Sequence, residues 1–122
     1  MCIVDSCGWL EWFSDGRLAE AYGPYLKDVS QLFVPVIVFY EVYKILKREI
    51  GEELAIRAVS YMKRSSVIPV EDTLALKAAD MALQHHLAMA DAMVYAAVVR
   101  YDSPLYTSDA DFKGLPLVHF ID

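Results

Sequence analysis

The sequence has little cysteine, glycine or proline, with two, five and five of these among 122 residues. The two cysteines, Cys2 and Cys7, cannot form a disulfide framework and favour a reduced pair. So few glycines and prolines exclude collagen-like and low-complexity chains. No apolar run reaches the roughly 20 residues of a membrane-spanning helix, and the N-terminus lacks the basic segment of a signal peptide. We therefore expect a cytoplasmic protein that does not enter a membrane.

Basic residues are also scarce, since 11 Lys and Arg stand against 17 Asp and Glu and give a net charge of −6. Nonspecific binding to nucleic acid normally needs a basic surface, so the net negative charge does not indicate this kind of binding. Apolar residues, in contrast, make up 57% of the chain. This fraction excludes intrinsic disorder and suffices for one hydrophobic core. We predict a single domain over residues 1–122.

Short apolar runs alternate with longer amphipathic segments. The short runs predict five strands, at residues 1–4, 31–34, 67–70, 105–107 and 117–121. Apolar residues three or four apart predict helices, at residues 6–13, 17–27, 36–50, 52–64, 71–87 and 91–101. Because apolar strands separated by helices form parallel sheets covered on both faces, we expect an α/β fold. It should have three layers, α/β/α, around a mostly parallel five-stranded sheet.

Four acidic residues stand where these elements begin or end, or within an apolar segment. Asp5 and Asp109 follow the first and fourth strands, and Asp91 opens a helix. Glu41 is the only charged residue between positions 28 and 44. The carboxyl ends of parallel strands line the crevice in which open α/β sheets bind ligands. If the first and fourth strands are neighbours, these carboxylates converge on one pocket.

Each of these acids also has an ordinary structural role open to it. Asp5 and Asp91 suit helix N-termini, and Glu41 suits a pair with a lysine one turn on. Asp109 and Asp111 lie in a polar loop, where aspartate is common; we expect the first to face the pocket and the second to cap the turn. Four ionised carboxylates together need cations, and oxygen ligands select Mg²⁺ or Mn²⁺ rather than Zn²⁺.

Four segments, taken in order, resemble the PIN-domain nucleases, and most closely the VapC toxins of toxin–antitoxin pairs. They are Ile-Val-Asp5-Ser6, Tyr-Glu41-Val-Tyr-Lys, Met-Ala-Asp91-Ala-Met-Val-Tyr-Ala and Tyr-Thr107-Ser-Asp109-Ala-Asp111-Phe. Each motif alone is weak, but their order and separations cover essentially the whole chain. The resemblance implies a catalytic, metal-binding quartet supported by three further residues. The quartet is Asp5, Glu41, Asp91 and Asp109, and the supporting residues are Ser6, Thr107 and Asp111.

The same resemblance implies a metal-dependent endoribonuclease that hydrolyses RNA phosphodiesters as the toxin of a type II toxin–antitoxin system. It also implies a homodimer inhibited by a small cognate antitoxin. Backbone phosphates need cations, and six of the eleven Lys and Arg lie between positions 44 and 64. Lys44, Lys47 and Arg48 are therefore predicted to face the RNA. The alternatives are a non-catalytic PIN scaffold and an RNA-processing nuclease outside a toxin–antitoxin pair.

Two other groups of residues have competing interpretations. Trp9, Trp12 and Phe13 share one face of a short helix, which favours core packing. The same face suits a partner-binding groove, because aromatic residues are enriched at interfaces, and the antitoxin is expected there. His85 and His86 lack the ligand spacing of a zinc site and favour a helix end.

Overall fold

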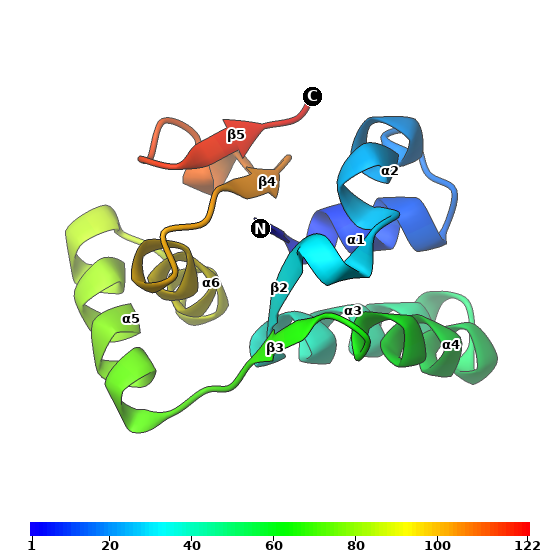
Figure 1. Ribbon diagram of the computed structural model, residues 1–122, viewed down its shortest axis with the longest axis horizontal. Coiled ribbons are helices and arrows are strands. Elements are labelled where there is room, and N and C mark those ends of the chain that lie inside the picture. Colours follow the sequence, from blue (N-terminus) through cyan, green and yellow to red (C-terminus); the bar gives the residue numbers. More distant parts are fainter.

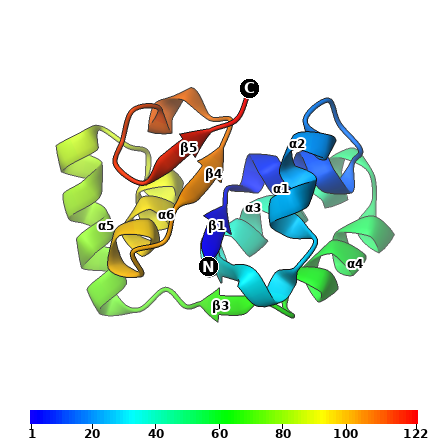
Figure 2. The same ribbon diagram turned by 45° about the horizontal axis from the view of Figure 1, so that its top comes forward.

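The computed structural model describes all 122 residues and has a three-layer α/β/α fold (Figures 1 and 2). Its strands are β1 (Cys2–Val4), β2 (Leu32–Pro35), β3 (Ser66–Ile68), β4 (Leu105–Thr107) and β5 (Val118–Phe120). They form one sheet in the order β3-β2-β1-β4-β5, and every neighbouring pair is parallel. The predicted fold class is confirmed, and parallel pairing extends through the whole sheet.

Six helices connect the strands, as the periodicity predicts. They are α1 (Ser6–Phe13), α2 (Ala19–Leu26), α3 (Val36–Glu49), α4 (Glu52–Met62), α5 (Asp72–His85) and α6 (Met89–Arg100). Two 3-10 turns, η1 (Val29–Gln31) and η2 (Ala110–Phe112), precede β2 and follow β4. None of the helices combines the length and the apolar character needed to cross a membrane.

Four of the five strands differ from their predicted bounds by one or two residues, and for two of them the reason is local. β3 ends at Ile68 instead of residue 70 because Pro69 has no N–H to donate to a strand ladder. β2 begins at Leu32 instead of residue 31 because Gln31 closes a 3-10 turn. Asp28 caps that turn by accepting from the backbone N–H of Ser30 at 3.1 Å. Pro69 therefore determines where β3 ends, and the turn capped by Asp28 determines where β2 begins.

The chain reverses its direction across the sheet next to β1. It moves outward from β1 to β2 and β3 through α1–α4, and then returns through α5 and α6 to β4 on the other side of β1. Because such crossovers are right-handed, α1–α4 lie on one face of the sheet and α5 and α6 on the other, as Figure 1 shows. Ligands of such sheets bind beside the carboxyl ends of the strands at the reversal, which are β1 and β4 here.

The helices that flank this reversal are anchored in the core. Trp9 of α1 is fully buried, with its ring stacked on Phe13 at 5.7 Å and edge-on to Tyr61 of α4 at 6.2 Å between centroids. The core-packing interpretation of Trp9 is therefore correct. α6 is apolar around most of its circumference, and its buried residues are Ala92, Val94, Tyr95, Ala96, Ala97 and Val98. A helix buried on most sides is a rigid support for the residues in its first turn.

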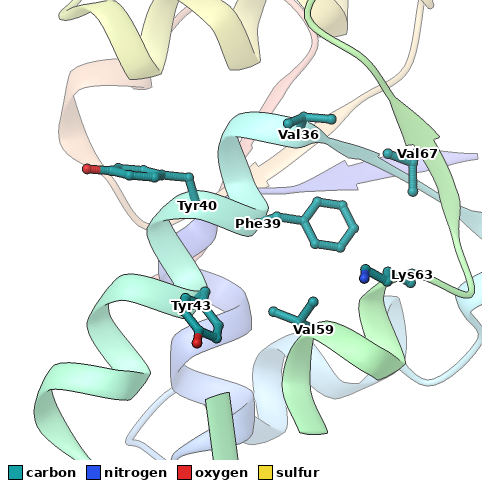
Figure 3. A pocket seen from close by; sticks show the side chains of 7 residues that line it. All are labelled: Val36, Phe39, Tyr40, Tyr43, Val59, Lys63 and Val67. Atoms are coloured by element: carbon teal, nitrogen blue, oxygen red, sulfur yellow. The ribbon is translucent and has the colours of Figure 1, made fainter. Parts of the chain in front are cut away.

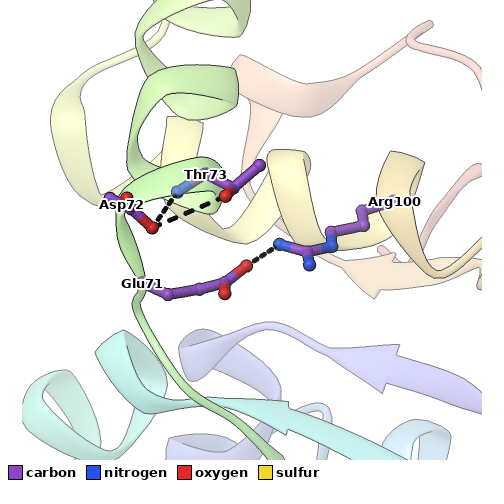
Figure 4. Close-up of polar contacts among 4 residues, drawn as sticks. All are labelled: Glu71, Asp72, Thr73 and Arg100. Atoms are coloured by element: carbon purple, nitrogen blue, oxygen red, sulfur yellow. Dashed lines mark hydrogen bonds and ion pairs between the residues drawn. The ribbon is translucent and has the colours of Figure 1, made fainter.

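Two polar contacts lie on the surface at the N-terminus of α5. Glu71, which precedes α5, forms an ion pair with Arg100 at the end of α6 (Figure 4). Asp72 accepts from the backbone N–H of Thr73 at 2.9 Å and so satisfies one free donor of the first turn. Both members of the ion pair are about two-fifths exposed, so solvent screens the pair and it adds little to the stability of the fold. Buried apolar contacts, rather than this pair, stabilise the α5–α6 unit.

Candidate metal centre

Asp5 lies at the carboxyl end of β1 and is only 3% exposed. Its Oδ1 accepts from the backbone N–H of Ser6 at 2.8 Å, where Asp5 caps α1. Its Oδ2 accepts from the hydroxyl of Thr107 at 2.8 Å, across the junction of β1 and β4. Both oxygens are thus fixed, one by a donor in the first turn of α1 and the other by a donor on β4. One carboxylate serves as a helix cap and also lies at the sheet reversal.

The loop after β4 is organised by two short polar contacts. Thr107 Oγ1 accepts from the backbone N–H of Asp109 at 3.0 Å. Asp109 Oδ1 in turn accepts from the backbone N–H of Asp111 at 2.9 Å and caps η2. The expectation that Asp111 caps this turn is wrong: the extended backbone of Asp109 places its own carboxylate over the N–H two residues on, as in other Asx turns.

α6 brings a third carboxylate to this loop. The helix begins at Met89 instead of Asp91, because Ala88 takes the extended capping position, so Asp91 occupies the first turn. The helix N-terminus favours a negative charge there. Oxygen atoms of Asp91, Asp109 and Asp111 lie within 4.8 Å of one another. We call these three residues the carboxylate cluster.

Glu41 approaches the same region from α3. It is half-buried, and burial together with the charge of Asp5 raises its pKa above the usual value, while Ser6 and Lys44 act in the opposite direction. Lys44 forms no ion pair with it and instead lies over the ring of Tyr40, 4.9 Å from the centroid. Glu41 and Asp5 therefore lie near the carboxylate cluster and are not among the three residues within 4.8 Å.

Asp91 is the residue on which the local charges act most strongly. Burial raises its pKa to about 7, and the charges of Asp109, Asp5, Glu41 and Asp111 add to the effect in that order. Burial is also the main cause of the raised pKa of Asp5, although its hydrogen bonds oppose the shift. The three ion pairs of the structure involve none of these five carboxylates. The region therefore carries excess negative charge, and no protein cation forms an ion pair with it.

These properties fit a hard divalent cation. All donors are carboxylate oxygens, and a cation between them would remove the repulsion that raises the pKa of Asp91. The only group of three or more candidate ligands is the carboxylate cluster, so the cysteines and histidines form no zinc site. His86 instead ends α5 in a left-handed conformation, with φ of 58°. This agrees with its expected place at a helix end.

The three residues predicted to face RNA lie on α3 and differ in their surroundings. Lys47 pairs with Glu52 at 3.5 Å and Arg48 with Glu49 at 2.8 Å, both on exposed surface. Lys44 has no carboxylate within ion-pair distance. Exposed pairs contribute little, so all three cations are accessible to phosphates. Their contact with RNA stays a prediction.

Two apolar grooves lie away from the carboxylates. The larger, of about 460 Å³, lies between α3, α4 and β3, and Figure 3 shows the side chains that line it: Val36, Phe39, Tyr40, Tyr43, Val59, Lys63 and Val67. The second, of about 370 Å³, lies between α1 and α4 and is lined by Trp12, Phe13, Leu54, Arg57, Ala58 and Tyr61. Trp12 and Phe13 thus belong to a groove while their neighbour Trp9 belongs to the core.

Replacing Asp109 and Asp111 separately should distinguish their roles. Asp109→Ala removes a member of the carboxylate cluster and also the cap of η2, so we expect weaker Mn²⁺ binding and a loss of about 1 kcal/mol without metal. Asp111→Ala removes no cap and lessens the repulsion on Asp91, so it should weaken Mn²⁺ binding and leave the metal-free protein at least as stable as the parent. Thermal melts in EDTA and Mn²⁺ titrations measure both quantities. Equal metal-free stabilities would contradict the capping role of Asp109.

The polar surroundings of Asp5 include three residues that the sequence analysis did not assign to the site. They are Cys7, Tyr22 and Ser108, whose polar atoms lie 2.7–3.7 Å from one another. Tyr22 and Ser108 are 86 positions apart, and no local pattern reports such a contact. In the sequence, only the position of Ser108 between Thr107 and Asp109 indicated that one of these three residues belongs to the site.

Comparison with known proteins identifies the family. The sequence profile of the PIN domain matches residues 2–116, so the chain belongs to the PIN domain family. No curated protein sequence matches it significantly. The fold is shared with solved toxin structures of low sequence identity. A toxin–antitoxin complex from Klebsiella pneumoniae has a TM-score of 0.81 at 21% identity, with 99% of this chain and 100% of the other covered.

Two further structures show the same likeness. Mycobacterium tuberculosis VapC20, described as a toxin that cleaves the sarcin-ricin loop, has a TM-score of 0.76 at 15% identity, over 93% of this chain and 92% of its own. DNA-bound VapBC from Salmonella typhimurium has a TM-score of 0.77 at 12% identity, with 100% of this chain and 98% of the other covered. At such identities the likeness establishes the fold, and the predicted PIN-like architecture is confirmed.

Proposed function

We propose that this PIN domain is a Mg²⁺- or Mn²⁺-dependent endoribonuclease and the toxin of a type II toxin–antitoxin system in the cytoplasm. The observation that carries the proposal is the carboxylate cluster, with Asp5 and Glu41 beside it and no ion pair to any of these five acids. The shared fold of solved toxin–antitoxin proteins supports the biological setting. A non-catalytic scaffold would not need five mutually repelling carboxylates at one edge of its sheet.

Each acid has a distinct part in the proposed reaction. Asp91, Asp109 and Asp111 would hold the metal ion, with Asp5 and Glu41 completing the site. A bound divalent ion supplies a water nucleophile and stabilises charge on a phosphodiester. Asp5 cannot rotate, because Ser6 and Thr107 hold both of its oxygens. Asp91, with its pKa of about 7, is only partly ionised at neutral pH, and a bound cation would favour its ionised form.

RNA contacts are proposed for the exposed cations of α3. Lys44 lies one turn after Glu41 and lowers the pKa of that carboxyl, so its ammonium group is close to the acidic region. A phosphate bound by Lys44 would therefore lie next to the carboxylates, with Lys47 and Arg48 further along the same helix. We propose single-stranded or looped RNA as the substrate, since its bases are accessible to a protein.

The two apolar grooves are the proposed partner surfaces. We assign the groove between α1 and α4 to the antitoxin, because the rings of Trp12, Phe13 and Tyr61 are suited to an apolar peptide segment. We assign the larger groove to a second copy of the chain. The lining of this groove is almost entirely apolar, and Tyr40 at its rim is 59% exposed. Such a surface is typical of a homodimer interface.

The proposed activity is tested by RNA cleavage at controlled metal concentration. The purified protein should cleave a structured RNA with Mg²⁺ or Mn²⁺ and lose all activity in excess EDTA, because no protein cation replaces the ion. Restoring Mn²⁺ should restore cleavage. Full cleavage in EDTA would overturn metal dependence, and Mn²⁺ binding without cleavage of any RNA would favour the scaffold.

A further inference from the structure

A chain of hydrogen bonds runs from the hydrophobic core to the acidic region. Tyr22 of α2 is fully buried, and its hydroxyl lies 2.7 Å from the Oγ of Ser108. The Ser108 hydroxyl donates to the sulfur of Cys7 at 3.5 Å, and the Cys7 thiol donates to Asp5 Oδ2 at 3.7 Å. Because Ser108 gives its only proton to sulfur, Tyr22 must donate to Ser108. All three donors therefore point toward Asp5.

This chain reaches both strand ends at the sheet reversal. The sulfur of Cys7, on α1, also lies 3.6 Å from Thr107 Oγ1, at the end of β4. Thr107 donates to Asp5 and accepts from the backbone N–H of Asp109. The hydroxyl of Tyr22 is consequently connected to Asp5 through Cys7 and to the loop carrying Asp109 through Ser108.

The position of Tyr22 depends on a close helix contact. Gly8 of α1 has no side chain, and a Cβ there would lie 2.4 Å from the Tyr22 ring and 2.6 Å from Val4. The ring is therefore fixed against α1 and β1 at van der Waals distance, with no room to move. Burial also raises the pKa of the Tyr22 hydroxyl, which keeps the donor proton in place.

We infer that Tyr22 is a positioning residue of the metal centre: its hydroxyl fixes Ser108 and thereby orders the β4–η2 loop and Asp5 for cation binding. The inference rests on the proposed metal-dependent function. Tyr22 itself contacts neither the carboxylate cluster nor the reacting atoms. Its effect passes through Ser108 and Cys7, as a partner outside the ligands orients the ligands of other metal sites.

The test compares two buried tyrosines that each lose one hydroxyl. Tyr22→Phe should weaken Mn²⁺ binding about 10-fold, measured by calorimetry or by the spectrum of free Mn²⁺. Tyr95→Phe is the matched control, because Tyr95 is 2% exposed and its hydroxyl donates to the carbonyl of Pro116 at 2.9 Å. It should lower the melting temperature in EDTA and leave the Mn²⁺ affinity unchanged.

A double-mutant cycle with Ser108 completes the test. Ser108→Ala should weaken Mn²⁺ binding as Tyr22→Phe does, and the double variant should be no weaker than either, since both remove the same contact. Parent-like Mn²⁺ affinity in Tyr22→Phe and in Ser108→Ala would overturn the inference and leave the proposed function standing. A parent protein that binds no Mn²⁺ would overturn both.

Discussion

Replacing Asp91 with Asn should reduce RNA cleavage at least about 100-fold, the size of effect expected when a group that stabilises charge at a reaction centre is lost. The change removes one negative charge from the carboxylate cluster and keeps the side-chain shape. No hydrogen bond of the fold depends on this carboxylate, and the rest of α6 is held by buried apolar residues. The loss should therefore appear as weak metal binding in a folded protein, measured by cleavage at saturating RNA and by Mn²⁺ titration.

The control for this substitution is an acid far from the site. Asp80 lies on the exposed side of α5, so Asp80→Asn makes the same charge change without touching the carboxylates. It should cleave RNA as the parent does. In cells, unpartnered expression of the parent and of Asp80→Asn should arrest growth, and Asp91→Asn should not. Parent-like cleavage by Asp91→Asn would show that Asp91 has no part in the reaction and only stabilises the N-terminus of α6.

The fold could be predicted because its signals are local. Apolar runs predicted every strand and helical spacing predicted every helix, although most bounds were wrong by one or two residues. In two strands a single residue explains the difference. Pro69 ends β3 early, and Asp28 converts the predicted start of β2 into a turn. The sheet order depends on which strands meet after long connections. Only the structure supplies that information, and its β1–β4 ladder meets the condition on which the predicted pocket depended.

The sequence predicted which acids belong to the candidate site, because their positions relative to the strands and helices are unusual. Asp5 and Asp109 followed strands, and Glu41 interrupted an apolar helix, so each was conspicuous in the sequence. The hydrogen bonds of these acids could not be predicted, because they depend on the direction of the local backbone. Asp109 caps η2, and Asp111 instead lies close to Asp91. The contact of Tyr22 with Ser108 joins α2 to β4 and required the tertiary structure.

Without metal, the protein should lose stability as the pH rises from about 4 to about 7. The pKa of Asp91 is about 7 in the folded protein, above its ordinary value of 3.8. The folded state therefore binds more protons than the unfolded state between these values, and the free energy of unfolding falls as pH rises. The raised pKa values of Asp5 and Glu41 act in the same direction. Solvent screening at half-buried Asp91 limits its share to about 1–2 kcal/mol.

Asp91→Asn and Mn²⁺ should each remove the loss of stability at high pH, but the substitution should also prevent most of the stabilisation by Mn²⁺. In EDTA the variant lacks the titrating group, so it should be more stable than the parent at pH 8 and similar to it at pH 4. With Mn²⁺ at 100 times the dissociation constant, the parent should gain about 2.7 kcal/mol by mass action, and the variant should gain much less. The order of the two melting temperatures at pH 8 should thus reverse when Mn²⁺ replaces EDTA. Two results together would contradict both the repulsion between the carboxylates and the metal site. They are a lower melting temperature of the variant than of the parent in EDTA, and an equal rise in melting temperature of both proteins with Mn²⁺.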